Sequence, residues 1–332
     1  MPGVACMSRG QALWLDCDTG LDDALALLAA CRTPGVELRG VSTVAGNCPL
    51  EVATENTLRI LELAGAGRTA VHPGAAAPLV APAGDAREVH GTDGLGGLAT
   101  QIPAARGRPR PESAAAALVR ALRAQPGRIA VVATGPLTNL ALAQALAPDV
   151  PRLARQLVVM GGAVGVPGNV GPACEFNFAA DPEAAAAVLA APWPIVQVGL
   201  DVTLQVRLGE AEAVALEAAP AGPGRSVPLF CAAALRAYAA AYTRQDGDGR
   251  APMHDPLAVA VALDPSLVRA AQLPAAVETS GALTRGMLVA DRRVLTRPSL
   301  LGGRRTIQCC LDVDVAAARS RLLSAWGAPP EG

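Results

Sequence analysis

Short apolar runs alternate with longer stretches of mixed polarity through the first two thirds of the chain. The short runs predict buried strands at residues 12–15, 36–44, 128–133, 156–160 and 195–198, and the longer stretches predict helices at 50–64, 137–146 and 182–190. Strands that alternate with helices in this way favour a mainly parallel sheet with helices on both of its faces.

The last third of the chain has a more helical pattern. Helices are predicted at 210–219, 226–244, 257–263 and 313–326, with one strand at 306–311, and residues 81–111 predict a long surface loop because they are rich in Gly, Pro and charge. No repeat or linker divides the chain. We therefore expect a single α/β domain over 10–327, with an open, Rossmann-like sheet, a helical C-terminal portion, and flexible tails at 1–9 and 328–332.

Composition excludes several classes of function. The chain has 332 residues, 51% of them hydrophobic, which is enough for a large core, but no apolar run approaches the roughly 20 residues of a membrane span. A net charge of −1 without a basic run argues against nucleic acid as a partner. Residues 1–12 lack the features of a secretory signal, and the eight cysteines show no CxxC spacing. Reduced thiols in a cytoplasmic protein are expected.

Four aspartates cluster directly after the first predicted strand: Asp16, Asp18, Asp22 and Asp23. A turn at this point places carboxylates at the C-terminal edge of a parallel sheet, where α/β proteins keep their sites. Carboxylates this close repel one another unless a cation neutralises them, and hard divalent cations prefer oxygen ligands. Helix capping by Asp22 and a favourable dipole interaction of Asp23 are the alternative, but they account for only two of the four.

Further polar clusters follow the other predicted strands, and together they carry a resemblance. In chain order the motifs are DxDxGxDD, VAGN, HGxDGLGG, TGPLTNLA, VVMGGA, GNVxPxxEFN and HDPLAVA. With this order and spacing the chain resembles the nucleoside hydrolases, the calcium-dependent N-ribohydrolases of the inosine–uridine-preferring type. The resemblance extends from about residue 13 to at least residue 263. It implies hydrolysis of the N-glycosidic bond of ribonucleosides to free base and ribose, in nucleoside catabolism and salvage.

The resemblance also implies a metal site and two catalytic residues. Asp18, Asp23 and Asp255 match the family's carboxylate ligands for Ca²⁺, and the backbone carbonyl of Thr134 matches its neutral ligand. Asp18 also matches the general base that activates a metal-bound water. His254 matches the residue that assists departure of the base.

Substrate binding is implied for a further set of residues. Ribose would contact Asp22, Asn47, Asn169, Glu175 and Asn177, with Met160 and Phe176 from the same motifs also lining the site. His90, Tyr238 and Tyr242 would face the base, although core packing is an alternative for the two tyrosines. His72 is expected to be structural. Thr19 stands where the family often has proline, and a threonine at this position could loosen the turn.

Other classes fit less well. The register after Asp18 does not suit an aspartate-nucleophile phosphatase, the spacing does not suit an EF-hand loop, and no phosphate site for a phosphorylase is evident. A catalytically silent homologue that binds calcium and ribose stays an alternative. The family resemblance implies a homodimer or homotetramer, and the sequence does not indicate the preferred base.

Overall fold

A single open sheet organises the chain. The computed structural model describes residues 10–80, 82, 84–293 and 305–329, and within these nine strands form one sheet in the order β10-β9-β11-β6-β5-β4-β1-β2-β3. Its strands are β1 (Gln11–Cys17), β2 (Val36–Thr43), β3 (Val71–Pro73), β4 (Ile129–Ala133), β5 (Gln156–Met160), β6 (Ile195–Val198), β9 (Val268–Val277), β10 (Leu288–Ala290) and β11 (Thr306–Val313). All pairings from β11 to β3 are parallel, and β9 pairs antiparallel with β10 and β11. The predicted α/β class with a mainly parallel sheet is confirmed.

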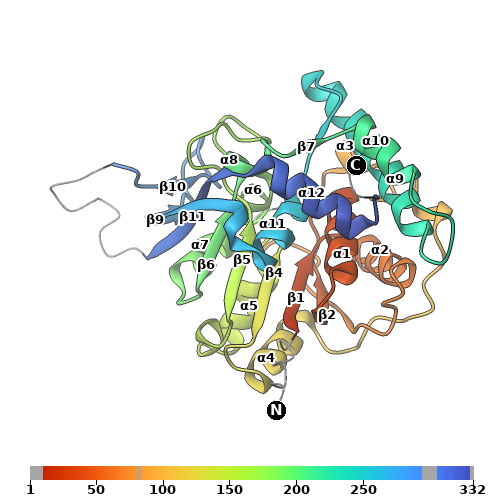
Figure 1. Ribbon diagram of the computed structural model, residues 1–332. Helices are drawn as coiled ribbons and strands as arrows, with labels where there is room; N and C mark the ends of the chain where they lie inside the picture. Colours follow the sequence, from red (N-terminus) through yellow and green to blue (C-terminus); the bar gives the residue numbers. More distant parts are fainter. Residues whose placement is uncertain (1–9, 81, 83, 294–304, 330–332) are drawn as a thin grey trace, which may run out of the picture.

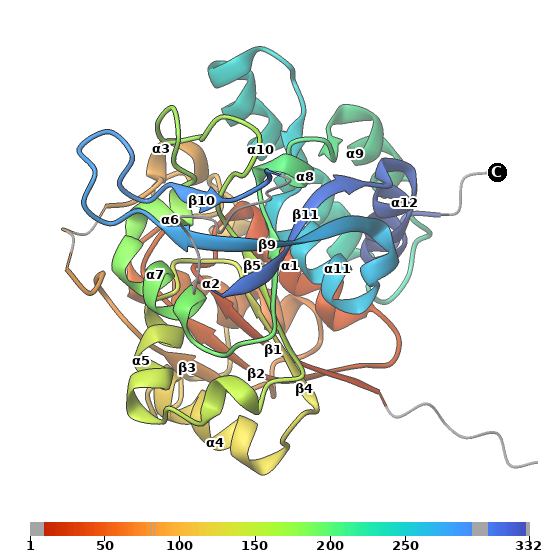
Figure 2. The ribbon, with the colours of Figure 1, turned by 90° about the vertical axis from the view of Figure 1, so that its left-hand side faces the viewer.

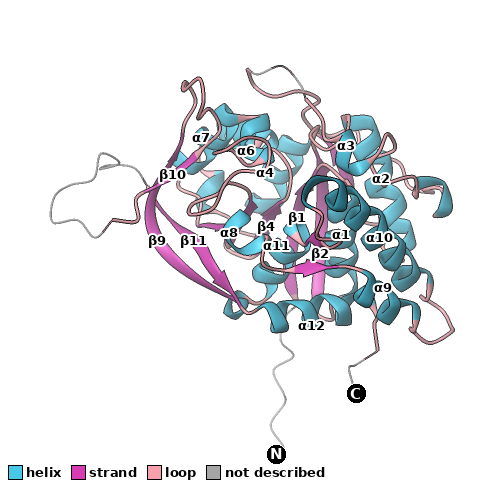
Figure 3. Cartoon of the chain, turned by 90° about the horizontal axis from the view of Figure 1, so that it is seen from above, coloured by secondary structure: helices cyan, strands magenta, loops and turns pink. Residues whose placement is uncertain are grey.

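Helices cover both faces of the sheet (Figures 1 and 3). The longer helices are α1 (Leu21–Arg32), α2 (Leu50–Leu63), α4 (Ala114–Ala124), α5 (Thr138–Leu146), α7 (Pro182–Ala190), α9 (Glu210–Glu217), α10 (Ser226–Asp246), α11 (His254–Leu263) and α12 (Val315–Trp326). The short helices are α3 (Arg87–His90), α6 (Phe176–Ala180) and α8 (Leu200–Thr203), with 3₁₀ turns at Ala99–Gln101, Val150–Arg152 and Pro265–Leu267. Among the described residues, no helix has the length and apolar character needed to cross a membrane.

Strand β1 shows why the sheet is buried on both sides. Leu13 and Leu15 pack with α1, α10, α11 and α12 in one hydrophobic cluster, whereas Ala12 and Trp14 pack with α4, α5 and α7 in a second cluster. Successive side chains of a strand point to opposite faces. A continuous apolar run is therefore what a central parallel strand between two helical layers requires.

The predicted elements differ from the structure mainly in three places. Strands β9 and β10 were not predicted, and Figure 2 shows them at the front, beside β11 at one edge of the sheet. Strand β3 was also missed. The segment expected to be a surface loop contains α3 and buries His90 and Leu95, because Leu95, Leu98 and Ile102 join the core.

The parallel arrangement places the polar clusters at one edge of the sheet. The loops after β1, β2, β4, β5 and β6 all leave from the C-terminal ends of their strands. A small second sheet, in which β7 (Arg207–Leu208) pairs with β8 (Ala251–Pro252), fixes where α11 begins and so delivers His254 to the same edge. The predicted domain limits stay a prediction, and the expected tails 1–9 and 328–332 lie outside the described residues except for residues 328 and 329.

Candidate active site

The acidic turn after β1 is fully buried. Gly20, not Asp22, is the N-cap of α1; the Gly20 N–H donates to Asp23 Oδ2 at 2.9 Å, and the Asp23 N–H donates to Asp22 Oδ1 at 3.2 Å. Asp22 is therefore not the capping residue. These hydrogen bonds at the start of the helix involve only Asp22 and Asp23, so capping does not account for Asp16 and Asp18. Thr19, which stands where the family often has proline, links the turn to α2, because its hydroxyl lies 2.6 Å from that of Thr57.

Three carboxylates converge on one point. Asp22, Asp23 and Asp255 each offer an oxygen atom, and these atoms lie within 4.8 Å of one another. Asp255 comes from the first turn of α11, which packs against α1. Asp18 lies alongside and accepts a hydrogen bond from the Asn47 N–H at 2.6 Å through Oδ2. The group that lies closest together thus contains Asp22, where the sequence prediction had Asp18.

Two oxygen atoms of this cluster have no partner. Among the described residues, Asp18 Oδ1 and Asp255 Oδ2 are buried without a hydrogen bond. A buried charge is costly unless it is paired or coordinates a metal. Burial, followed by repulsion from neighbouring carboxylates, raises the pKa of Asp18 and Asp255 well above the ordinary value. A hard divalent cation would remove both penalties, so these residues fit such an ion.

Thr134 contributes to the same cluster from the end of β4. Its hydroxyl donates to Asp23 Oδ1 at 2.7 Å, and its backbone carbonyl accepts from Asn177 Nδ2 at 2.7 Å. A carbonyl oxygen has two lone pairs, so one remains available for a metal. Its position therefore agrees with a neutral ligand beside the carboxylates.

A cavity of about 350 Å³ opens beside these residues. It is lined by all of the sequence-predicted site residues except Asp18 and Asp23: Asp22, Asn47, His90, Thr134, Met160, Asn169, Glu175, Phe176, Asn177, Tyr238, Tyr242, His254 and Asp255. Asp18 and Asp23 contact a residue of the lining: Asp18 accepts a hydrogen bond from the Asn47 N–H, and Asp23 accepts one from Asn47 Nδ2. The size and the convergent polar groups are typical of a small-molecule site.

One side of the cavity is built by the loop after β5 and by α6. Glu175 caps α6, with Oε1 accepting from the Asn177 N–H and Oε2 from the Gly162 N–H, both at 2.8 Å. Burial raises the pKa of Glu175 to about 7, although these backbone donors oppose the shift. Asn169 Oδ1 accepts from the Phe176 N–H at 2.9 Å. Glu175 and Asn169 are therefore held in place by hydrogen bonds from backbone N–H groups.

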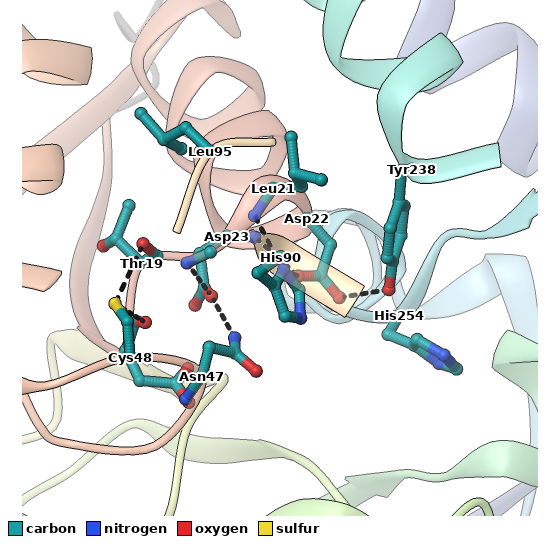
Figure 4. A network of polar contacts seen from close by, with 12 residues as sticks. Thr19, Leu21, Asp22, Asp23, Asn47, Cys48, His90, Leu95, Tyr238 and His254 are labelled. Atoms are coloured by element: carbon teal, nitrogen blue, oxygen red, sulfur yellow. Dashed lines mark hydrogen bonds and ion pairs between the residues drawn. The ribbon is translucent and has the colours of Figure 1, made fainter. Parts of the chain in front are cut away.

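Helices α3 and α10 also contribute to the cavity wall, and Figure 4 shows His90 and Tyr238 beside Asp22. His90 Nδ1 accepts from the Leu21 N–H at 3.0 Å, and the Tyr238 hydroxyl donates to Asp22 Oδ2 at 2.9 Å. Tyr238 packs in the hydrophobic core with only 1% of its surface exposed. Tyr238 therefore packs in the core and also contacts Asp22, while its contact with the base stays a prediction.

His254 has partners on both ring nitrogens. Nε2 lies 2.9 Å from the Tyr242 hydroxyl and Nδ1 lies 2.8 Å from the Thr203 hydroxyl. Burial, and then the positive charge of Arg207, lowers the pKa of His254 to about 3. The imidazole is therefore neutral at pH 7, and Tyr242 stands next to it in the cavity wall.

Several residues at this site escaped sequence analysis. Thr203 contacts His254 from α8, and its position after the strand β6 was an available signal. Asp85, Ala86, Glu88, Val89, Val170 and Gln245 also line the cavity. Most of these lie in the segment expected to be a surface loop, where the sequence gives no packing signal. His72 is buried outside the cavity lining, stacked on Trp14.

Comparisons with known proteins give a consistent result. A family model described as inosine-uridine preferring nucleoside hydrolase matches residues 13–320. The chain is 35% identical over 300 residues to a pyrimidine-specific ribonucleoside hydrolase, RihA, from Citrobacter koseri, covering 90% of this chain and 92% of the relative. A plant nucleoside hydrolase, PpNRh1, superposes with a TM-score of 0.89 at 30% identity, covering 96% of this chain and 99% of that one. The purine-preferring ribonucleoside hydrolase from Gardnerella vaginalis superposes with a TM-score of 0.86 at 31% identity, over 95% and 98%.

Proposed function

This chain belongs to the inosine-uridine preferring nucleoside hydrolase family, and we propose that it hydrolyses the N-glycosidic bond of ribonucleosides to free base and ribose. The observation that carries the proposal is the buried carboxylate cluster of Asp22, Asp23 and Asp255 at one end of a cavity lined by amides and tyrosines. Carboxylates and amides suit the vicinal hydroxyls of a furanose, since they accept from and donate to them.

We propose that calcium is held by Asp18, Asp23, Asp255 and the carbonyl of Thr134. The unpartnered oxygens of Asp18 and Asp255 and the all-oxygen donor set support this assignment. Bound calcium would lower the pKa of a ligating water and hold ribose hydroxyls. Chelation followed by add-back of calcium or magnesium distinguishes calcium from other hard cations.

The chain's own residues account for the remaining chemistry. Asp18 takes the proton of the attacking water: it matches the family's general base, and its Oδ1 is one of the buried carboxylate oxygens that accept no hydrogen bond among the described residues. Ribose is bound by Asp22, Asn47, Asn169, Glu175 and Asn177, with Met160 and Phe176 in the cavity wall. As the C–N bond breaks, positive charge develops on the sugar, as in glycoside hydrolysis. The surrounding carboxylates stabilise that charge more than they stabilise the neutral substrate.

The base would lie against α3 and α10. His90, Tyr238 and Tyr242 line this side, and His254 assists departure of the base through its contact with Tyr242. The relatives are named as pyrimidine-specific and purine-preferring enzymes. Base preference therefore varies among related proteins and is a property to measure for this one.

Replacing His254 with Ala should separate substrates by their leaving groups. We expect loss of roughly 10²-fold or more in kcat on inosine or uridine, because departure of a poor leaving group needs a hydrogen-bond donor. p-Nitrophenyl riboside should be affected far less, since its leaving group is stable as an anion. Steady-state kinetics on the two substrates makes the comparison, and equal losses on both would exclude a role in base departure.

Release of ribose from a panel of nucleosides tests the proposed function itself. Release with at least one natural ribonucleoside supports hydrolysis. Binding of calcium and nucleoside without any release would favour the catalytically silent homologue. A homodimer or homotetramer, and a cytoplasmic location, stay predictions that sedimentation and fractionation can check.

A further inference from the structure

Thr203 lies at the end of α8 with 0% of its surface exposed, and its hydroxyl faces His254. Several other threonines in helices use their hydroxyl to bond the carbonyl four residues earlier, as Thr54 does with Leu50 and Thr57 with Ala53. Thr203 does not. Among the hydrogen bonds of the described residues, the only one its hydroxyl makes is to His254 Nδ1, at 2.8 Å.

This single contact determines where the proton of the imidazole lies. A buried hydroxyl hydrogen needs an acceptor, and Nδ1 is the acceptor within reach. Nδ1 must then be unprotonated, so Nε2 carries the hydrogen of the neutral ring. Nε2–H donates to the Tyr242 oxygen at 2.9 Å, and the hydrogen of Tyr242 is left free to point into the cavity.

We infer that Thr203 is a positioning residue that fixes the Nε2–H tautomer of His254, so that the Tyr242 hydroxyl is held as a hydrogen-bond donor to the departing base. This inference rests on the proposed function. With the opposite tautomer, Nε2 would accept the hydrogen of Tyr242 and turn it away from the base. Nothing else in the described surroundings of His254 Nδ1 makes this choice.

The chemistry balances without a second proton transfer. The electron pair of the C–N bond goes to the ring nitrogen of the base, and the proton of the attacking water goes to Asp18. Tyr242 stabilises the departing anion by donating a hydrogen bond. The base takes its proton from solvent after it leaves, and Asp18 returns the equivalent proton to solvent.

The tautomer is measurable directly, because the chain has only three histidines. His90 Nδ1 accepts from the Leu21 N–H, so its hydrogen is on Nε2; His72 Nδ1 lies 3.0 Å from the Glu112 carbonyl, which only accepts, so its hydrogen is on Nδ1. Protein labelled with ¹⁵N-histidine thus contains an internal standard for each tautomer. In a long-range ¹H–¹⁵N spectrum at pH 7.5, assigned with His254→Gln, we expect His254 to group with His90. Grouping with His72 would overturn the inference.

Kinetics of two variants test the consequence for catalysis. Thr203→Val keeps the shape but removes the donor. It should lower kcat on uridine or inosine by about 10- to 100-fold, the same order as the loss of an outer hydrogen-bond partner from a metal-bound histidine. The rate on p-nitrophenyl riboside should change by less than about twofold. Thr203→Ser keeps the hydroxyl and should restore the wild-type ratio between the substrates.

The outcomes separate this inference from the proposed function. If the wild-type protein releases no ribose from any nucleoside, the proposed function fails. If the wild type is active and Thr203→Val loses nothing, or loses the same factor on both substrates, only the positioning role fails. Should Thr203→Val not fold, the spectrum of the wild-type protein decides alone.

Discussion

Replacing Asp18 with Asn should lower kcat by roughly 10²–10⁴-fold with the fold intact. Asn has the same shape and can still accept the Asn47 N–H, which bonds Asp18 Oδ2 at 2.6 Å. It cannot take a proton from water at the position of Oδ1, the oxygen without a partner. Ribose release from inosine gives kcat, and thermal unfolding reports on the fold.

Asp16 offers a matched control for this variant. It lies two residues earlier, is equally buried, and has its pKa raised to about 7 by burial. Its Oδ1 accepts hydrogen bonds from the Ser42 hydroxyl and Asn139 Nδ2, and the family resemblance gives it no ligand, substrate or proton-transfer role. Asp16→Asn should therefore retain most of the activity. A rate near that of the wild type in Asp18→Asn would remove Asp18 as the general base.

Replacing Asp255 with Asn should have opposite effects on the stability of the calcium-free and the calcium-bound protein. Without calcium the variant should be at least as stable as the wild type, because one of several mutually repelling buried carboxylates becomes neutral. With free calcium at a hundredfold excess over its Kd, the wild type should gain about 2.7 kcal/mol, and the variant should gain much less. Thermal unfolding in chelator and in calcium measures both effects.

Asp181 is the control for a buried aspartate outside the cluster. It accepts from the Thr138 hydroxyl and the Leu79 and Ala184 N–H groups, so Asp181→Asn should destabilise both forms and leave the gain from calcium unchanged. If Asp255→Asn showed the full wild-type gain, Asp255 would not be a ligand.

Local sequence pattern predicts the central fold because each central strand is buried on both faces. The runs that became β4 and β5 are almost entirely apolar, and the turn after β1 combines Gly20 with the carboxylates that hold it. Strand β9 could not be predicted in this way. Its sequence is rich in Ala and contains Pro274, and its conformation comes from pairing with β10 and β11.

The candidate site likewise has residues that local sequence pattern predicts and contacts that it does not. Its acidic and amide residues stand directly after predicted strands, so their meeting at one edge follows from a parallel sheet. The burial of His90 under α10 and the contact of Thr203 with His254 join segments far apart in the chain. Such contacts depend on how helices pack, which local pattern does not specify.

Calcium-dependent release of ribose can be measured in a single assay. Ribose release from inosine, uridine, cytidine and adenosine is measured before chelation, after chelation, and after calcium or magnesium is added back. We expect release that chelation abolishes and that calcium restores better than magnesium, with the rates ranking the four bases. Release that persists after complete removal of metal, or no release from any of the four with calcium bound, would rule out calcium-dependent hydrolysis of these nucleosides.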